Sequence, residues 1–241
     1  SAVSITGSNH QGACAYFAMM PTKEDMIGFC WTINCGNVMA PWGGVAAQLG
    51  NNPFAISIPC GKRPSIVLDM ATSVVAKGKI ELARKTKTPI PITWALDKEG
   101  KPTSDAEAAY WGTVQPFGGY KGVGLTFVNA MISAVLSNSN FGENMTDLAE
   151  APDIPNNTGH LLQVVNIASI TDVAEFKERM DNAVDYIKNG VRADGIDELY
   201  VPGEIEHNNM LRQIEQGIVY PVEVIEEIQT ISSNLGVDVV L

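Results

Sequence analysis

The chain has 241 residues, of which 45% are hydrophobic, and a formal net charge of -11. This length and composition suffice to bury a sizeable core, and they predict a compact protein and not a string of modules. The negative charge argues against nucleic acid as a partner, because phosphate contacts need clustered Lys and Arg. No apolar run approaches the roughly 20 residues of a membrane-spanning helix, and no basic-then-apolar leader is recognisable. We therefore expect no membrane partner and a cytoplasmic location.

The charge is distributed unevenly along the chain. Residues 1–140 hold 11 basic and 8 acidic side chains, whereas residues 141–241 hold 5 and 19. An anionic ligand would prefer the first part, although the acidic part is equally well explained by solvated helix faces. We expect a cofactor-binding core over 1–140 and an acidic α/β segment over 141–241 that packs on it, so that both form one structural unit.

The cysteines and histidines do not have the spacing of a metal site. Cys14, Cys30, Cys35 and Cys60 form no CxxC pair, and the chain contains only three histidines that could join them. Structural zinc sites need such closely spaced ligands. We therefore expect no metal and reduced thiols.

The first half of the chain is expected to be rich in strands. Residues 2–6 predict a strand with no turn before it, so Ser1 is expected to follow a missing or cleaved segment. A helix is expected over 13–20. β-branched and aromatic residues then predict buried strands, at 26–34, 54–59 and 65–70. Residues 71–88 predict a helix with basic residues near its end, and the prolines over 89–110 predict an extended loop or edge hairpin.

The second half is expected to be mainly helical. A helix that follows Gly124 is expected to face the core through apolar residues at helical spacing: Leu125, Val128, Ile132, Val135 and Leu136. A polar surface loop or lid over 140–160 and a strand over 161–169 follow. Helices are expected over 172–188 and from Pro221 onward. This order is not a regular βαβ alternation, so it predicts the α+β class.

The two commonest phosphate-binding loops, GxGxxG and GxxxxGK[ST], are absent from the chain. The densest glycine segment is GGYKGVG at 118–124, which comes directly before a predicted helix. Its free backbone N–H groups and Lys121 could bind an anion. Glycine clusters before helices are more often tight turns with no ligand, and this is the simpler explanation.

His10 and Asp69 are the best candidates for chemistry. His10 lies in the turn-like segment GSNHQG, and its side chain titrates near neutral pH, so it could move a proton. A histidine satisfied by local hydrogen bonds is the simpler alternative. Asp69 lies at the end of a predicted strand, where its carboxylate could orient a histidine or hold a ribose hydroxyl, or merely cap the next helix.

Several segments taken together resemble the type-2 malate/L-lactate dehydrogenase family, which includes ureidoglycolate dehydrogenase. The resemblance covers essentially the whole chain in family order. The segments that carry it are GSNHQGACAYFAMM, MIGFCWTIN, APWGG, LGNNPFAISIP, IVLDMATSVVAKGKI, PIPITWALDKEGKPTSD, QPFGGYKGVGL and VPGEIE. It implies a non-Rossmann fold in which NAD or NADP lies across a mostly antiparallel mixed sheet with flanking helices, within a homodimer.

The resemblance also implies roles for particular residues. The family's catalytic acid/base falls on His10, and Asp69 is expected to assist at the same site. The cofactor-binding positions are implied to be Asn34, Asp69, Met70, Ala71, Lys121, Gly203, Glu204 and Ile205. The implied reaction is hydride transfer between a small 2-hydroxy acid, of the malate, lactate or ureidoglycolate type, and its 2-oxo acid.

Three features depart from the family pattern. Gln11 replaces an aromatic or small residue, and Asn51-Asn52-Pro53 stands where GTNP is usual. The family's amino-terminal Ser-His-Gly segment, with its nearby arginine, has no match in this chain. The alternative hypothesis is therefore a truncated, non-catalytic fragment that binds a nucleotide or dimerises.

Overall fold

The computed structural model describes residues 1–146 and 151–238, which form two compact units, Ser1–Gly203 and Glu204–Leu241. The strands, all in the first unit, are β1 (Ala2–Ser8), β2 (Met26–Thr32), β3 (Phe54–Ile58), β4 (Ile66–Met70), β5 (Ala95–Leu96), β6 (Pro102–Thr103), β7 (Thr113–Val114) and β8 (Thr158–Asn166). Its helices are α1 (Cys14–Met19), α2 (Lys77–Thr86), α3 (Ala106–Tyr110), α4 (Tyr120–Ala130) and α5 (Val173–Lys188). Short helical turns are η1 (Met20–Glu24), η2 (Met131–Val135), η3 (Gly142–Asn144) and η4 (Ile167–Ser169).

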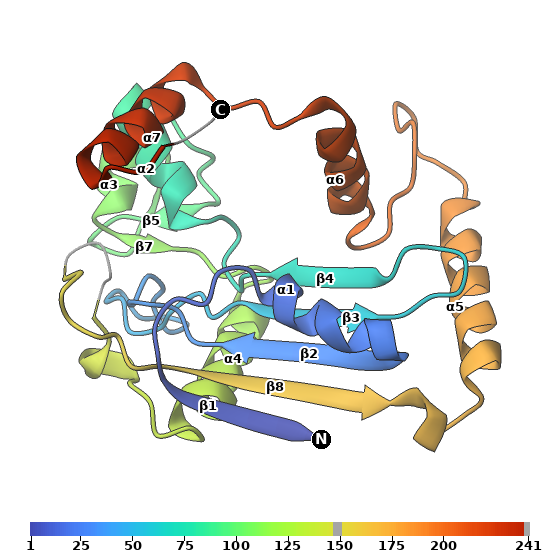
Figure 1. The fold of residues 1–241 in the computed structure, drawn as a ribbon. Helices are drawn as coiled ribbons and strands as arrows, with labels where there is room; N and C mark the ends of the chain where they lie inside the picture. Colours follow the sequence, from blue (N-terminus) through green and yellow to red (C-terminus); the bar gives the residue numbers. More distant parts are fainter. Residues whose placement is uncertain (147–150, 239–241) are drawn as a thin grey trace. The chain divides into compact units, whose positions relative to one another are not determined.

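The centre of the first unit is a five-stranded sheet in the order β1-β8-β2-β3-β4 (Figure 1). Every neighbouring pair of these strands is antiparallel. This pairing confirms the predicted α+β class with a mostly antiparallel sheet. The long connection from β4 to β8 places β8, the last strand along the chain, between β1 and β2. Early and late parts of the unit therefore share one sheet.

Helices cover both faces of this sheet. On one face α1 packs so closely that a side chain at Gly28 of β2 would meet the Ala18 carbonyl oxygen at 2.1 Å. Cys14, Ala18 and Cys30 are buried in this contact. On the opposite face η2 approaches β8, where a side chain at Gly159 would meet the Ser133 carbonyl oxygen at 2.2 Å. Small residues are needed on both faces because the backbones lie within van der Waals distance.

The predicted core-facing side of the helix after Gly124 is wrong. Val128, Val135 and Leu136 are 53 to 63% exposed, and Leu125 and Ile132 are only half-buried. The buried positions are instead small or polar: Gly122, Thr126, Asn129, Ala130, Ser133 and Ala134. The close approach to the sheet selects for small volume, and the polar members bond to backbone carbonyls, so hydropathy alone indicates the wrong face.

A smaller sheet in the order β6-β5-β7 packs with α2 and α3 around a second core. The predicted edge hairpin over 89–110 is confirmed by β5 and β6, while α3 occupies its last residues. The predicted helix over 71–88 begins only at Lys77. Residues 71–76 are irregular and not helical because backbone bonds hold them, from Thr72 N to Asn51 O and from Val74 N to Gln115 O.

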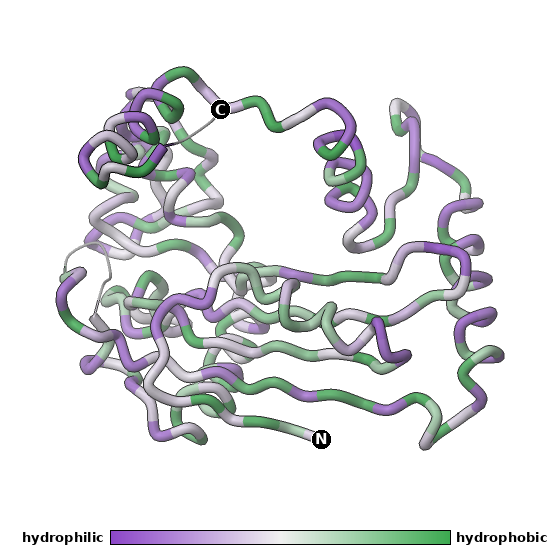
Figure 2. Tube along the Cα trace, viewed as in Figure 1, coloured by the Kyte–Doolittle hydropathy of each residue, from purple (hydrophilic) through white to green (hydrophobic). Residues whose placement is uncertain are grey.

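Helix α5 confirms the prediction over 172–188, and the Asp172 side chain caps it by accepting the Glu175 N–H at 2.9 Å. Figure 2 shows hydrophilic and hydrophobic residues alternating along it. Its Asp181 carboxylate accepts three successive N–H groups of the turn between β3 and β4, those of Gly61, Lys62 and Arg63, at 2.7 to 3.1 Å. Slight burial raises the pKa of Asp181, but these backbone hydrogen bonds lower it more, so its pKa lies below the usual value.

We expect Asp181→Asn to lower the free energy of unfolding by about 1 kcal/mol at neutral pH, an amount reduced by solvent access. Because the folded pKa is depressed, this stabilisation is present above the unfolded pKa and is lost as the pH falls through the folded pKa. Urea unfolding at pH 7 and near pH 3 tests this. The difference between wild type and variant should shrink at the lower pH, and Glu178→Gln on the same helix should show no such difference at either pH.

The second unit contains α6 (Glu204–Gln216) and α7 (Val222–Leu235), and neither helix has a buried residue. The prediction that Pro221 starts the last helix is confirmed, since Pro221 is the residue just before α7, and Gly236 ends it in a left-handed conformation. Helix α6 was not predicted. Among the described residues, no helix is long and apolar enough to cross a membrane.

Candidate active site

His10 lies in the exposed loop between β1 and α1. Its Nδ1 accepts the Gly12 N–H at 3.0 Å, and Gly12 has φ +82°, which favours glycine. Because Nδ1 accepts this bond, the proton of the neutral ring lies on Nε2. The ring is therefore oriented, and its Nε2–H is the hydrogen-bond donor that it offers to a ligand. The Gly12 bond is also what the simpler alternative expects, namely that His10 is a histidine satisfied by local hydrogen bonds.

The loop that carries His10 is tied to the start of β8. The Asn9 side-chain oxygen accepts the Asn156 N–H at 3.0 Å, and the Asn9 carbonyl accepts the Thr158 hydroxyl at 2.8 Å. Gly7 N–H donates to the Asn157 side chain at 3.1 Å. These bonds join residues about 150 positions apart in the chain. They fix the backbone on the amino-terminal side of His10, as a catalytic side chain on a loop requires.

Asp69 lies on β4, and its carboxylate accepts the Ala15 N–H at 2.8 Å. Ala15 belongs to the first turn of α1, whose N-cap residue supplies no side-chain bond. Asp69 therefore supports the start of α1, the helix that follows the His10 loop, and not α2 as the capping alternative supposed. This bond brings Asp69 and the His10 loop into one region of the fold.

Asn34 follows β2 and is held by a buried side chain that the sequence did not single out as functional. Its N–H donates to the Asn52 side-chain oxygen at 3.0 Å, and the Asn52 side chain donates in turn to the Thr126 carbonyl of α4 at 2.9 Å. Asn52 is fully buried, and its own carbonyl accepts the Asn129 side chain at 2.7 Å. The end of β2 and the middle of α4 are thus connected through one carboxamide.

The glycine segment before α4 has the conformation that its composition suggested. Gly118 and Gly119 have φ of +59° and +64°, and a side chain at Gly122 would meet the Phe117 carbonyl oxygen at 2.1 Å. No side chain caps α4, and its first turn holds no acidic residue. Lys121 is exposed and forms no salt bridge with a described residue. An uncapped helix start with a free cation suits an anion.

Hydrogen bonds bring several of the predicted cofactor positions together. Phe117 N–H, just before the glycines, donates to the Thr72 carbonyl at 3.0 Å, and Thr72 directly follows Met70 and Ala71. Thr72 N–H donates to Asn51, the neighbour of Asn52, at 2.8 Å. Asn34, Met70, Ala71 and Lys121 are therefore joined by a continuous backbone and carboxamide network.

The remaining predicted positions lie at the junction of the two units. Gly203, the last residue of the first unit, has φ +86° and packs so tightly that a side chain there would meet Val67 of β4 at 2.8 Å. The Val67 N–H donates to the Pro202 carbonyl at 3.0 Å. Gly203 is thus fixed beside β4. Glu204 and Ile205 begin α6 in the second unit.

Gln11, which replaces the aromatic or small residue of the family pattern, has a structural role. Its side-chain amide lies 3.5 Å from the Cys14 sulfur and 3.2 Å from the Cys30 sulfur. A hydrogen bond with Cys30 and burial raise the pKa of the Cys14 thiol. None of the four cysteines forms a disulfide bond within the described part of the chain. The residue after His10 thus faces inward and anchors the loop on α1 and β2.

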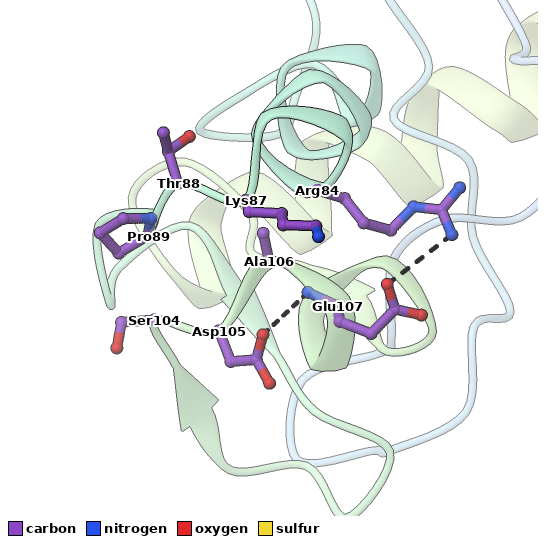
Figure 3. A pocket seen from close by; sticks show the side chains of 8 residues that line it. All are labelled: Arg84, Lys87, Thr88, Pro89, Ser104, Asp105, Ala106 and Glu107. Atoms are coloured by element: carbon purple, nitrogen blue, oxygen red, sulfur yellow. Dashed lines mark hydrogen bonds and ion pairs between the residues drawn. The ribbon is translucent and has the colours of Figure 1, made fainter.

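Two pockets of the first unit lie away from the predicted site residues. One, of about 430 Å³, lies between α2 and α3 (Figure 3), where Arg84 and Glu107 form an ion pair at 3.7 Å and Asp105 accepts the Glu107 N–H. The other, of about 700 Å³, lies beside α4 among apolar residues such as Leu49 and Phe127. Neither is lined by His10, Asp69 or Lys121. Within residues 1–146 and 151–238, no group of three or more His, Cys, Asp or Glu side chains could hold a metal ion.

Comparison with known proteins identifies the family of the chain. A family model described as malate/L-lactate dehydrogenase matches residues 1–229. The L-sulfolactate dehydrogenase of Methanocaldococcus jannaschii is 35% identical over 98% of this chain and 67% of its own length. The NAD(+) ureidoglycolate dehydrogenase of Escherichia coli K12 is 29% identical over 94% of this chain and 63% of its own length. The chain thus spans about two thirds of the length of these relatives.

Solved structures agree as well. The structure of malate dehydrogenase from Entamoeba histolytica superposes with a TM-score of 0.91 at 26% identity, and covers all of this chain and 70% of that one. The sulfolactate dehydrogenase structure from M. jannaschii gives 0.87 at 34% identity, over 99% and 67% of the two chains. The fold is therefore of the non-Rossmann type, as predicted. The chain belongs to the malate/L-lactate dehydrogenase family.

We expect Asn52→Ala to destabilise the protein by about 2 to 3 kcal/mol, because it leaves the Asn34 N–H without its partner and removes the bond that ties this segment to the Thr126 carbonyl of α4. Thermal unfolding measures this loss. Asn51→Ala is the control, since its side chain makes only a 3.4 Å contact with Ser73. If the two variants unfolded at the same temperature, Asn52 would not hold the site together as described.

Proposed function

We propose that the protein is an NAD- or NADP-dependent oxidoreductase that interconverts a small 2-hydroxy acid and its 2-oxo acid. The observation that carries this proposal is the network that joins Asn34, Ala71 and the start of α4, because it places a free Lys121 and uncapped N–H groups beside the other expected cofactor positions. Membership of the malate/L-lactate dehydrogenase family supports the reaction class.

The residues suit a dinucleotide. Lys121 and the first N–H groups of α4 would hold the pyrophosphate, while Asn34, Met70, Ala71 and Gly203 would line its path through backbone groups. Asp69 would offer a carboxylate to a ribose hydroxyl, and Glu204 and Ile205 are proposed as cofactor residues from the family resemblance alone. When bound, the nicotinamide ring supplies or accepts the hydride. Among the relatives, one is named for NAD(+), and a sulfolactate dehydrogenase of Chromohalobacter salexigens for NADP(+).

His10 would move the proton that accompanies hydride transfer. During oxidation its unprotonated nitrogen accepts the proton of the substrate hydroxyl, and during reduction the imidazolium returns a proton to the carbonyl oxygen. With the ring proton on Nε2, the basic nitrogen is Nδ1, so the Gly12 N–H bond to Nδ1 opens when His10 takes up the proton. Asp69 assists indirectly, because it fixes the start of α1 behind the His10 loop.

Relatives named for sulfolactate, malate and ureidoglycolate all match the chain. The preferred substrate among these acids and lactate is therefore to be determined by the assay with a panel of acids. We also propose a homodimer and a cytoplasmic location on the basis of the family. The alternative of a non-catalytic fragment has no support from the comparisons, and nucleotide binding without turnover of any acid would favour it.

Lys121→Met should weaken NADH and NADPH binding about 10-fold, because one charge-assisted contact with phosphate is lost. Quenching of protein fluorescence by each nucleotide gives the dissociation constant. Lys101→Met, which removes an exposed lysine from the small sheet, is the matched control. The binding role of Lys121 would be wrong if both variants bound as wild type does.

His10→Gln should lower turnover of the preferred 2-oxo acid at least about 100-fold, the usual contribution of a general acid or base. The nucleotide dissociation constant should change less than about 2-fold, because only the proton is affected. The assay is NAD(P)H oxidation with a panel of 2-oxo acids, and His207→Gln on α6 is the matched control. Equal turnover by His10→Gln and wild type would remove His10 from the mechanism.

A further inference from the structure

Two cysteines meet where α1 packs on β2. Ala18 of α1 lies so close to Gly28 of β2 that a side chain at Gly28 would meet its carbonyl oxygen. Cys14 lies four residues before Ala18, and Cys30 lies two residues after Gly28, so each shares a face with its neighbour on the same element. Four residues of helix and two residues of strand both span roughly 6 to 7 Å. This spacing allows Cys14 to lie over Cys30, and both belong to one buried cluster.

A single amide contacts both sulfur atoms. The Gln11 side-chain nitrogen lies 3.2 Å from the Cys30 sulfur and 3.5 Å from the Cys14 sulfur, so the two sulfurs are neighbours. The cysteines are only 0 and 1% exposed, whereas Gln11 is half-buried. Gly12, the next residue, is exposed and has open space where a side chain would be. A small solute can therefore reach the sulfurs from the loop when the Gln11 side chain turns away.

The two thiols are not chemically equivalent. A hydrogen bond from the Cys14 thiol lowers the pKa of Cys30, and the Gln11 amide lowers it further, against the effects of burial and of the Asp69 charge. The same bond, together with burial, raises the pKa of Cys14. Because the thiolate is the reactive form, Cys30 is the nucleophile and Cys14 stays protonated beside it. Cys60 provides a contrast, since it is also buried and burial raises its pKa.

We propose that Cys14 and Cys30 form a dithiol that a hydroperoxide oxidises to a disulfide. With hydrogen peroxide, the Cys30 thiolate attacks one oxygen, the O–O bond breaks, and the other oxygen leaves as hydroxide, which takes up a proton to become water. Cys30 is then a sulfenic acid. The Cys14 sulfur attacks the Cys30 sulfur, and the hydroxyl group leaves with the Cys14 proton as a second water. The two sulfurs together lose two electrons, which the peroxide gains.

Disulfide formation acts on the His10 loop through Gln11. In the reduced protein the Gln11 amide holds the residue after His10 against the two sulfurs. The disulfide has neither a thiolate charge nor an S–H group, so the amide loses the acceptor that favoured its position. The loop then keeps its anchor at Asn9 and loses the one at Gln11. This consequence for catalysis rests on the proposed role of His10, whereas the disulfide itself does not.

The first experiment measures the oxidation without turnover. The reduced protein is treated with a small excess of hydrogen peroxide, its remaining thiols are alkylated under denaturing conditions, and its mass and peptides are analysed. We expect a disulfide that joins Cys14 to Cys30, with a loss of about 2 Da before alkylation, the mass of two hydrogen atoms. Cys60 should remain a thiol. A disulfide between any other pair, or no disulfide, would overturn the proposal.

Variants separate the roles of the two sulfurs. In Cys14→Ala, Cys30 should stop at the sulfenic acid, a gain of about 16 Da that dimedone traps, because no second thiol is present. In Cys30→Ala, Cys14 should react at least about 10-fold more slowly than Cys30 does in Cys14→Ala, because its thiol is protonated. Cys60→Ala is the matched control and should form the disulfide at the wild-type rate. Equal reactivity of the two single thiols would contradict the assignment of Cys30 as the nucleophile.

Gln11→Leu tests the amide, since it keeps a side chain of similar size without the donor. The disulfide should form about 3- to 10-fold more slowly, because the thiolate loses a hydrogen bond, while its higher basicity offsets part of that loss. A wild-type rate in folded Gln11→Leu would show that the amide does not activate Cys30. If this variant failed to fold, the two cysteine variants would decide the matter.

The last experiment tests the link to His10. The oxidised protein should turn over the preferred 2-oxo acid about 10- to 100-fold more slowly than the reduced protein, through misplacement of the loop. NADH should bind with an unchanged Kd, and dithiothreitol should restore turnover. Full turnover by the oxidised protein would overturn the effect on the loop. If the reduced protein turned over no acid, the proposed function would fail, while the mass measurement would still decide whether Cys14 and Cys30 pair.

Discussion

The carboxamide of Asn52 is the interaction on which the site depends. It is fully buried between the end of β2 and α4, and it accepts from one backbone group and donates to another. Asn34 lies beyond its strand, so its N–H has no partner in secondary structure, and the Asn52 carboxamide ties it to helix α4 on the opposite face of the sheet from α1. Asn129 then fixes the Asn52 backbone. Two layers of the fold are thereby held in one register at the proposed cofactor positions.

The loop that carries the proposed catalytic residue is also held by side-chain hydrogen bonds to distant parts of the chain. The loop that carries His10 rests on β8 through Asn9, and Gln11 reaches down to two thiols on α1 and β2. Asp69 then holds the start of α1. An exposed loop of few residues thus has anchors before and after the histidine. This arrangement leaves the imidazole accessible while its backbone is restrained, which is how a loop residue acquires a defined geometry.

The sequence predicted the elements well where hydropathy decides them. The strands β2, β3, β4 and β8 and the helix α5 follow from apolar and β-branched patterns, and their order correctly indicated the α+β class. It failed at α4, where Thr126, Asn129 and Ser133 are buried because the sheet is too close for larger side chains. It also failed at residues 71–76, where backbone bonds to residues distant in sequence override helix propensity.

The candidate site was predictable only in part, for a related reason. His10 and Lys121 stood out because a turn and a glycine cluster are local signals. Asn52 did not, since its importance comes from a partner 18 residues away. Local sequence carries no record of such pairings. The structural alternatives for His10 and the glycines remained open until the family resemblance was taken into account.

The inverted face of α4 has a consequence for how this protein can change over evolution. Small residues usually look like interchangeable spacers, yet a side chain at Gly122 of α4, or at Gly159 of β8 where η2 approaches, would meet a carbonyl oxygen at 2.1 or 2.2 Å. Val128, Val135 and Leu136 look like core residues but are more than half exposed, so packing constrains them little. Substitution patterns along this helix should therefore run opposite to hydrophobicity, with selection acting most strongly on the smallest side chains.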